Sequence, residues 1–154
     1  MICILHGFLL EGSGSNLWTR SIVEALCRQG HDVHLMAQEN HPDRYPFITE
    51  LHEHHRNGTT TITVFGSNPY PGGCTLHKPE IGDTLPVYVW DRYEEFPHVV
   101  PMIELGDAEL EQYVAWNAQV LRRVVETHGI TALHANHSVL MPQVPISMKV
   151  IAFL

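Results

Sequence analysis

Lysine is nearly absent from this sequence of 154 residues, which contains only Lys78 and Lys149. Lysine and arginine together number 9, against 17 aspartates and glutamates, so the formal net charge is −8. A protein that binds DNA or RNA normally presents a basic face to the phosphates. The composition therefore argues against a nucleic-acid-binding protein.

Long apolar runs are missing as well. The longest apolar stretches fall far short of the ~20 residues that a transmembrane helix needs, so we expect no membrane-spanning segment, although peripheral contact with a membrane stays compatible with the sequence. The first residues contain neither a basic segment nor a small-residue cleavage site, so we expect no signal peptide. These features favour a cytoplasmic protein.

Cysteine is scarce and forms no CxxC pair. Two of the three cysteines lie inside apolar segments, which indicates buried thiols in a reducing cytosol; the three are Cys3, Cys27 and Cys74. Histidine is abundant, with 12 residues, and its densest cluster lies within residues 52–55. In a helix His52 and His55 would share a face but His54 would not. We therefore expect a solvated helix end there and no metal site.

Hydrophobic patterning at the start of the chain predicts a βαβ unit. Residues 2–5 are apolar and indicate a buried strand, and a loop of small residues follows them. An amphipathic helical pattern then runs to Gly30, and residues 33–37 indicate a second strand. The crossover should be right-handed and the two strands parallel. The helix positions expected to face the core are Trp18, Ile22, Val23, Ala25 and Leu26.

The middle of the chain is less regular. Residues 39–57 are polar and suggest a loop with one short helix, whereas the β-branched residues 59–65 indicate a third strand. Residues 66–106 hold most of the prolines and several aromatic residues, and we expect a long loop excursion with one strand over 87–90. Loops of this length in compact domains are usually functional or mobile.

The last third returns to the strand–helix pattern. A helix is expected from Asp107, with acidic residues in its first turn, to Gly129, followed by strands over 130–133 and 148–154. Repeated strand–helix units predict the α/β fold class. We expect a single Rossmann-like domain with a doubly wound, mostly parallel sheet.

Two loops should meet at one edge of this sheet. In doubly wound sheets ligands bind beyond the carboxyl ends of the strands, where the strand order reverses. If strand 130–133 lies beside the first strand, the glycine loop faces His134 and the residues up to His137 across a crevice. The loop can bring backbone N–H groups and a helix N-terminus to a phosphate, or it can be a tight turn that binds nothing. Its residues are Gly12, Ser13, Gly14, Ser15 and Asn16.

The histidines at this edge are candidates for proton transfer. Imidazole titrates near neutral pH, so His134 or His137 could act on a substrate hydroxyl, although each could equally hydrogen-bond a loop backbone. Asn136 would add hydrogen-bonding groups suited to a sugar. His6, at the end of the first strand, is placed to face the same crevice.

The known nucleotide-binding fingerprints are incomplete. The GxGxxG pattern fails because Leu17 stands at the third glycine position, and no GK[ST] follows the loop. Glu39 does lie near the end of the second strand, where a dinucleotide domain binds ribose. A small dinucleotide- or nucleotide-binding Rossmann-like domain therefore remains one alternative.

Three segments resemble the N-terminal domain of family 4 glycosyltransferases, which have the GT-B fold. They are Ile2 to Glu39, with the loop Gly12-Ser-Gly-Ser-Asn16 and the helix end Gly30-His-Asp-Val33; Leu133-His-Ala-Asn-His-Ser-Val-Leu140; and, less diagnostic, Val87-Tyr-Val-Trp-Asp-Arg-Tyr93. The resemblance spans about residues 1–141. It implies one of two Rossmann-like domains that face each other across a cleft.

The resemblance also implies an activity. Such enzymes move a sugar from a nucleotide-sugar donor to a hydroxyl of a sugar, lipid or small molecule, with no cofactor and no essential metal. The glycine loop would approach the donor phosphates, and His134 and His137 would be catalytic candidates. The acceptor-side candidates are His6, Asn136, Asp91 and Arg92.

The likeness ends after Met141. The helix expected there is interrupted by prolines, no His-Gly motif follows, and no donor-binding domain is present in residues 1–154. We therefore expect a truncated N-terminal half that is inactive alone. The other alternative is a non-catalytic sugar-binding module that pairs with a separate chain.

Overall fold

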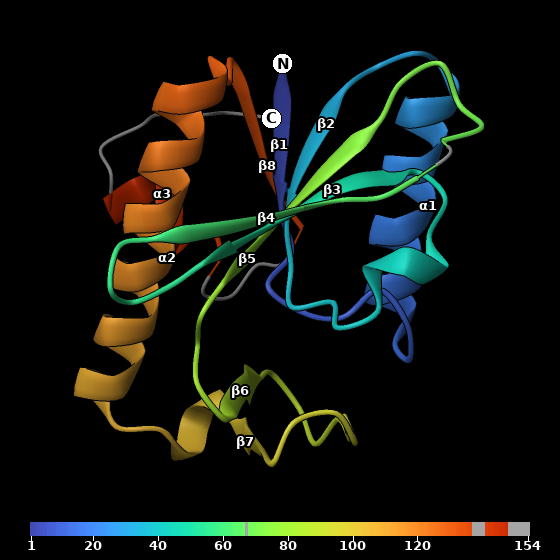
Figure 1. Ribbon diagram of the computed structural model, residues 1–154. Coiled ribbons are helices and arrows are strands. Elements are labelled where there is room, and N and C mark those ends of the chain that lie inside the picture. Colours follow the sequence, from blue (N-terminus) through green and yellow to red (C-terminus); the bar gives the residue numbers. More distant parts are fainter. Residues whose placement is uncertain (67, 137–140, 148–154) are drawn as a thin grey trace.

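A six-stranded sheet lies between helices in the computed structural model, which describes residues 1–66, 68–136 and 141–147 (Figure 1). The strand order is β4-β3-β5-β2-β1-β8, and every neighbouring pair is parallel except β3 and β4. The strands are β1 (Ile2–Leu5), β2 (Val33–Met36), β3 (Ile48–His54), β4 (Thr60–Val64), β5 (Cys74–Pro79) and β8 (Ala132–Ala135).

Helices lie on both sides of this sheet. Figure 1 shows α1 (Gly14–Arg28) on one side and α2 (Asp107–His128) with the short α3 (Gln143–Ser147) on the other. A separate parallel pair, β6 (Thr84–Val87) and β7 (His98–Pro101), lies beyond the carboxyl ends of the central strands. Two 3-10 turns complete the elements, at Pro42–Arg44 and Met102–Glu104. The chain is thus α/β with a mostly parallel sheet, which is compatible with a Rossmann-like fold.

The predicted β1–α1–β2 unit is confirmed, and so is α2. The strand expected at 130–133 is found as β8, two residues later, so His134 lies in the strand and not in the loop that follows it. The Ser13 side chain caps α1 by accepting from the backbone N–H of Asn16, and Gly30 follows the helix with a φ of 89°. Gly129 ends α2 in the left-handed conformation, with a φ of 62°. Two positions differ: Trp18, at 44%, and Ala25 are exposed, because the buried face of α1 is centred on Val23 and Cys27.

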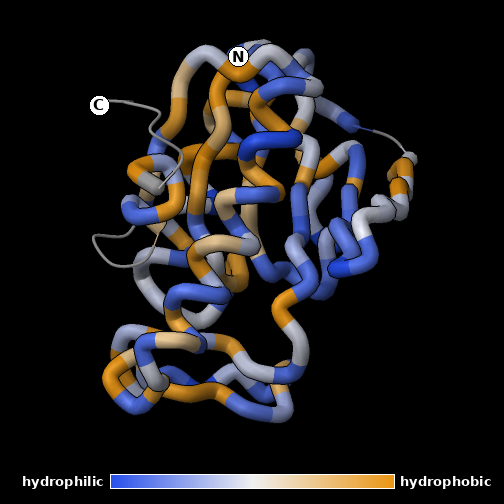
Figure 2. Tube along the Cα trace, turned by 90° about the vertical axis from the view of Figure 1, so that its left-hand side faces the viewer, coloured by the Kyte–Doolittle hydropathy of each residue, from blue (hydrophilic) through white to orange (hydrophobic). Residues whose placement is uncertain are grey.

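Alternation along the strands divides the core into two parts. In β1, Ile4 packs with the residues under α1, whereas Cys3 and Leu5 pack with those under α2. In β2, Leu35 and Met36 divide in the same way. Successive strand side chains point to opposite faces, and a parallel sheet covered by helices is buried on both. Figure 2 shows hydrophobic and hydrophilic stretches following one another along much of the trace.

Three expectations for the middle of the chain are wrong. Residues 48–54 form β3 rather than a loop with a helix, so His52 and His54 lie two apart on one face of a strand. The long excursion contains β5, which is inserted between β2 and β3. The strand expected at 87–90 ends at Val87, as β6. Strand pairing between distant segments decides all three, and local composition carries little of that information.

Three further expectations concern the cysteines, a membrane-spanning segment and the strand at 148–154. All three cysteines are buried free thiols, and burial raises the pKa of Cys3 to about 12 and that of Cys27 to about 11. Over the described residues, no helix is long and apolar enough to span a membrane. The strand expected at 148–154 lies outside the described residues.

A row of histidines lies beside the apolar core, on the face of the sheet that α2 covers. His34 comes from β2, His77 from β5, and His52 and His54 from β3, and all four are buried. His34 Nδ1 lies 2.9 Å from His77 Nε2, and His54 Nε2 lies 3.0 Å from His77 Nδ1. The half-buried ring of His128, at the end of α2, lies against them, with its centroid 4.5 Å from that of His34.

Burial keeps three of these rings neutral, those of His34, His54 and His77. Desolvation, reinforced by the neighbouring histidines, lowers the pKa of His34 and of His54 from 6.5 to about 4 and that of His77 well below 6.5. Asp32 and Glu50 oppose the shift of His34 by weaker attraction. Between the unfolded pKa of 6.5 and the folded pKa of about 4, the unfolded chain therefore binds more protons than the folded protein. The contribution of these rings to the free energy of unfolding is fully present above the unfolded pKa and is lost as the pH falls toward the folded pKa.

We expect the free energy of unfolding to decrease as the pH is lowered from about 7 to about 4. For one ring, a shift of this size corresponds to about 3 kcal/mol. Urea denaturation at several pH values would measure the effect. The informative window is about pH 6.5 to 5, above the range in which most carboxylates titrate. His34→Gln should reduce the slope there, and an unfolding free energy that stays constant across this window would contradict the prediction.

Candidate functional site

The loops that follow β1 and β8 meet at the carboxyl edge of the sheet. β8 pairs with β1 on the side opposite to β2, as the sequence predicts. The backbone N–H of Asn136 donates to the carbonyl of Leu5 at 2.9 Å, which fixes the start of the second loop against the end of β1. The candidates Asn136 and His134 are thereby brought to the N-terminal end of α1. His137, the other candidate of this segment, lies outside the described residues.

His6 is fully buried at the centre of this junction. Its Nε2 donates to the carbonyl of Leu9 at 2.9 Å and to the Asn16 side-chain oxygen at 3.0 Å. Its Nδ1 lies 3.1 Å from both the Thr19 hydroxyl and the Asn136 amide nitrogen, which donates to it. This pattern suits a neutral ring with its hydrogen on Nε2. Because His6 has no exposed surface, it positions the loops and does not itself reach the crevice.

Asn16 also points inward. It is fully buried, and its amide nitrogen donates to the carbonyl of Glu11 and, at 3.2 Å, to the hydroxyl of Tyr93. Asn16 therefore shapes the glycine loop from inside, and Tyr93 attaches the segment after β6 to that loop. Burial raises the pKa of Tyr93 above its usual value, so its hydroxyl stays protonated.

The outward side of the loop is formed by Ser13, Gly14 and Ser15. The hydroxyls of Ser13 and Ser15 lie 3.0 Å apart. Gly14, the first residue of α1, faces open space, since a Cβ built there would meet no atom within 4 Å. Gly12 has a φ of 95°, in the left-handed region that favours glycine. The first turn of α1 thus offers backbone N–H groups toward a ligand.

A cavity of about 270 Å³ lies against this loop. Gly12 and Arg92 both line it, so the structure brings together two of the predicted site residues. Asp91 does not line it and instead borders a neighbouring cavity with Arg92. Glu39 also lines the first cavity, but its carboxylate is occupied. It accepts from the backbone N–H of Leu10 at 3.0 Å, from that of His41 at 2.8 Å, and from the Tyr45 hydroxyl at 3.4 Å.

His134 lies at the rim of the junction. Its half-buried ring is tilted against the ring of Trp18, with 5.8 Å between the centroids. Trp18, which the helical pattern predicts in the core, is therefore part of this edge. Of the predicted candidates, His134 and the outward loop residues remain accessible, whereas His6 and Asn16 are buried behind them.

Sequence reasoning missed another cavity, of about 430 Å³, beyond the ends of β3 and β5. Lys78, one of the two lysines, lines it and donates to the side-chain oxygen of Asn40. Burial lowers the pKa of Lys78. The cavity could not be predicted from the sequence because it depends on β5, a strand whose neighbouring glycines and prolines are typical of loops.

No family model, no curated protein and no solved structure matches this chain. The resemblance to family 4 glycosyltransferases therefore stays a prediction that rests on the residues themselves.

The hydrogen bonds around His6 predict a position that is sensitive to mutation. Thr19→Val keeps the shape of the side chain but removes the hydroxyl that accepts from Asn136 and contacts His6 Nδ1. We expect it to lower the free energy of unfolding by about 1–2 kcal/mol, because buried polar groups lose a partner. Urea denaturation would measure the change.

Ser21→Ala is the matched control on the same helix. The exposed Ser21 hydroxyl donates to the carbonyl of Leu17 at 2.8 Å, as the Thr19 hydroxyl does to that of Ser15 at 3.0 Å. The control should stay within about 0.5 kcal/mol of the parent protein. Equal losses in the two variants would show that the network around His6 adds nothing to the local helix contact.

Proposed function

We propose that this chain is the acceptor-side domain of a nucleotide-sugar-dependent glycosyltransferase, which moves a sugar to a hydroxyl acceptor. The observation that carries the proposal is the junction of the two loops. The Asn136 amide, after β8, donates to the carbonyl of Ser15 at 3.4 Å, at the start of α1. A ligand at this edge would contact the glycine loop and the His134 segment together.

The donor diphosphate is assigned to the outward side of the glycine loop. Backbone N–H groups in the first turn of a helix lack partners within the helix, and the helix dipole favours an anion there. The hydroxyls of Ser13 and Ser15 add donors, and Gly14 leaves room for close approach. Residues 12–16 contain no lysine, so phosphate binding at this loop would depend on backbone dipoles and hydroxyl groups.

The acceptor is assigned to the rim formed by His134 and Trp18. An exposed indole beside an imidazole offers an apolar surface to a sugar ring and a base to its hydroxyl. As the acceptor oxygen bonds to the anomeric carbon, its proton would pass to His134, and the nucleoside diphosphate would leave with the electrons of the broken bond. Arg92, in the cavity beside Gly12, is placed to pair with an anionic group. Contacts to the donor nucleoside would come from a second domain, so we expect no transfer by residues 1–154 alone.

The glycine loop offers a direct test. Amide signals of the isotope-labelled chain would be followed by NMR while uridine diphosphate or guanosine diphosphate is added. We expect saturable shifts centred on residues 12–16. Gly14→Asp should abolish them, because it places a negative charge where the diphosphate binds.

Gly14→Ala is the matched control. Both variants have the same open space at this position, so neither should disturb the fold, and the alanine variant should keep most of the binding. Shifts confined to other parts of the chain would remove the glycine loop from the phosphate site. Equal binding by the aspartate and alanine variants would do the same.

A further inference from the structure

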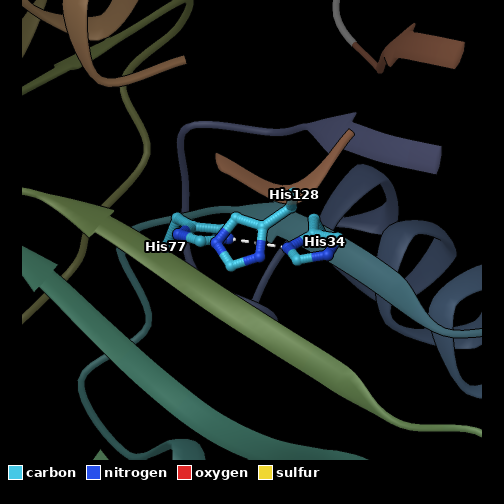
Figure 3. A group of neighbouring side chains, drawn as sticks. All are labelled: His34, His77 and His128. Carbon is cyan, nitrogen blue, oxygen red and sulfur yellow. Dashed lines mark hydrogen bonds between the residues drawn. The ribbon is translucent and has the colours of Figure 1, made fainter. Parts of the chain in front are cut away.

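The histidine row under α2 forms a group with the composition of a metal site. His34, His77 and His128 each offer one ring nitrogen, and these three atoms lie within 4.8 Å of one another. Figure 3 shows the His128 ring beside the hydrogen bond that joins the other two rings. The three residues come from β2, β5 and the last position of α2, so a folded chain is needed to assemble them.

The outer nitrogens of the row already have acceptors. His77 Nδ1 lies 3.0 Å from His54 Nε2, and His54 Nδ1 lies 3.2 Å from the Thr60 hydroxyl. His34 Nε2 lies 3.0 Å from the Met1 sulfur, a weak acceptor. When each outer nitrogen carries the hydrogen, His77 donates to His54, His54 to Thr60, and His34 to Met1. Metal-binding histidines typically donate their other N–H in this manner.

That arrangement leaves two lone pairs facing each other. His34 Nδ1 and His77 Nε2 lie 2.9 Å apart, and without a metal one hydrogen must lie between them. In a tetrahedral zinc site, with Zn–N bonds of about 2.0 Å, ligand nitrogens are separated by about 3.3 Å. The two nitrogens therefore need to separate by only a few tenths of an ångström, and the rings need to turn so that both lone pairs point at one ion.

We propose that His34, His77 and His128 bind a Zn²⁺ ion that joins the end of α2 to strands β2 and β5. Three imidazoles without a carboxylate favour zinc over the hard cations Mg²⁺ and Ca²⁺, which prefer oxygen ligands. The half-buried His128 ring, at a helix end, can adjust to complete the site and leaves a route from solvent.

The fourth ligand is either water or His52. The His52 ring centroid lies 5.0 Å from that of His77 and 5.9 Å from that of His128. Its Nε2 is paired with Glu50 at 2.8 Å, at the edge of the buried group, so it would have to leave this partner to bind the metal. This inference does not depend on the proposed glycosyltransferase function, since the site lies under α2 and away from the glycine loop.

The experiment compares the chelator-treated full chain with and without added ZnCl₂. Calorimetric titration should give one Zn²⁺ per chain, and Zn²⁺ should raise Tm. At free Zn²⁺ about 100 times Kd, the unfolding equilibrium constant should fall roughly 100-fold. His128→Gln should weaken binding at least about tenfold, while circular dichroism confirms that the helix end tolerates the change. His98→Gln, an exposed histidine on β7, is the matched control and should bind as the parent does.

Cobalt provides the second measurement. Co²⁺ in the site should give the intense visible absorption of a tetrahedral nitrogen site, and His34→Gln should remove it. No saturable binding, or binding that His128→Gln leaves unchanged, would overturn the proposal. Loss of binding in His55→Gln but not in His128→Gln would assign the ion to the surface near residue 55 and would overturn it as well.

Discussion

The contacts of the buried His6 ring fix the carboxyl edge of the sheet at β1 and β8, because α1 and the segment after β8 both satisfy polar groups through this ring. Its Nε2 donates to Asn16 of α1, and its Nδ1 contacts the Thr19 hydroxyl of α1 and accepts from the Asn136 amide after β8. A polar group left unpaired at this depth would cost free energy, so none of the segments can move alone. Asn16 extends the constraint to Tyr93, which attaches the segment after β6 to the glycine loop. The outward loop residues are thus supported by a rigid inner layer that a ligand does not touch.

The two buried faces of the sheet differ in polarity, and this difference accounts for the polar residues in its strands. The α1 face is apolar along β1, β2 and β5, whereas the α2 face is apolar along β1 and β8 and at Met36, the last residue of β2. Toward β3 that face carries histidines, which can be buried neutral and can pair with one another, as His34, His77 and His54 do. Lysine or glutamate in those positions would need an opposite charge to be buried there. Histidine is the residue that lets a polar half-face lie under a helix.

Much of the fold follows from local patterns, and the remainder depends on pairing between distant segments. The β1–α1–β2 unit, α2 and β8 have clear caps and periodicity, and the meeting of the two loops follows from parallel topology. Residues 74–79 conceal a central strand because Lys78, Pro79 and the preceding glycines are typical of loops. In residues 48–54 the spacing of two between His52 and His54 is a strand signal that the sequence offers. Alternation along β2 and β5 likewise places His34 and His77 on that same face of the sheet. The inward orientation of His6 and Asn16 could not be predicted, since it depends on hydrogen bonds between segments that only the folded chain brings together.

The same demand for satisfied polar groups distinguishes two hypotheses for this edge, recognition of a nucleotide through its ribose and recognition through its phosphate groups. A dinucleotide domain needs an acidic residue at the end of β2 to bind the ribose hydroxyls. Glu39 has that position, yet it is only 3% exposed and its carboxylate already accepts from Leu10, His41 and Tyr45. A ribose could bind it only by displacing these partners, and the backbone N–H groups of Leu10 and His41 would then lose theirs. Gly14, by contrast, has no atom within 4 Å of its vacant side-chain position. A ligand at this edge therefore meets the first turn of α1 at little cost and Glu39 at a high one, which favours recognition through phosphate groups over recognition through ribose.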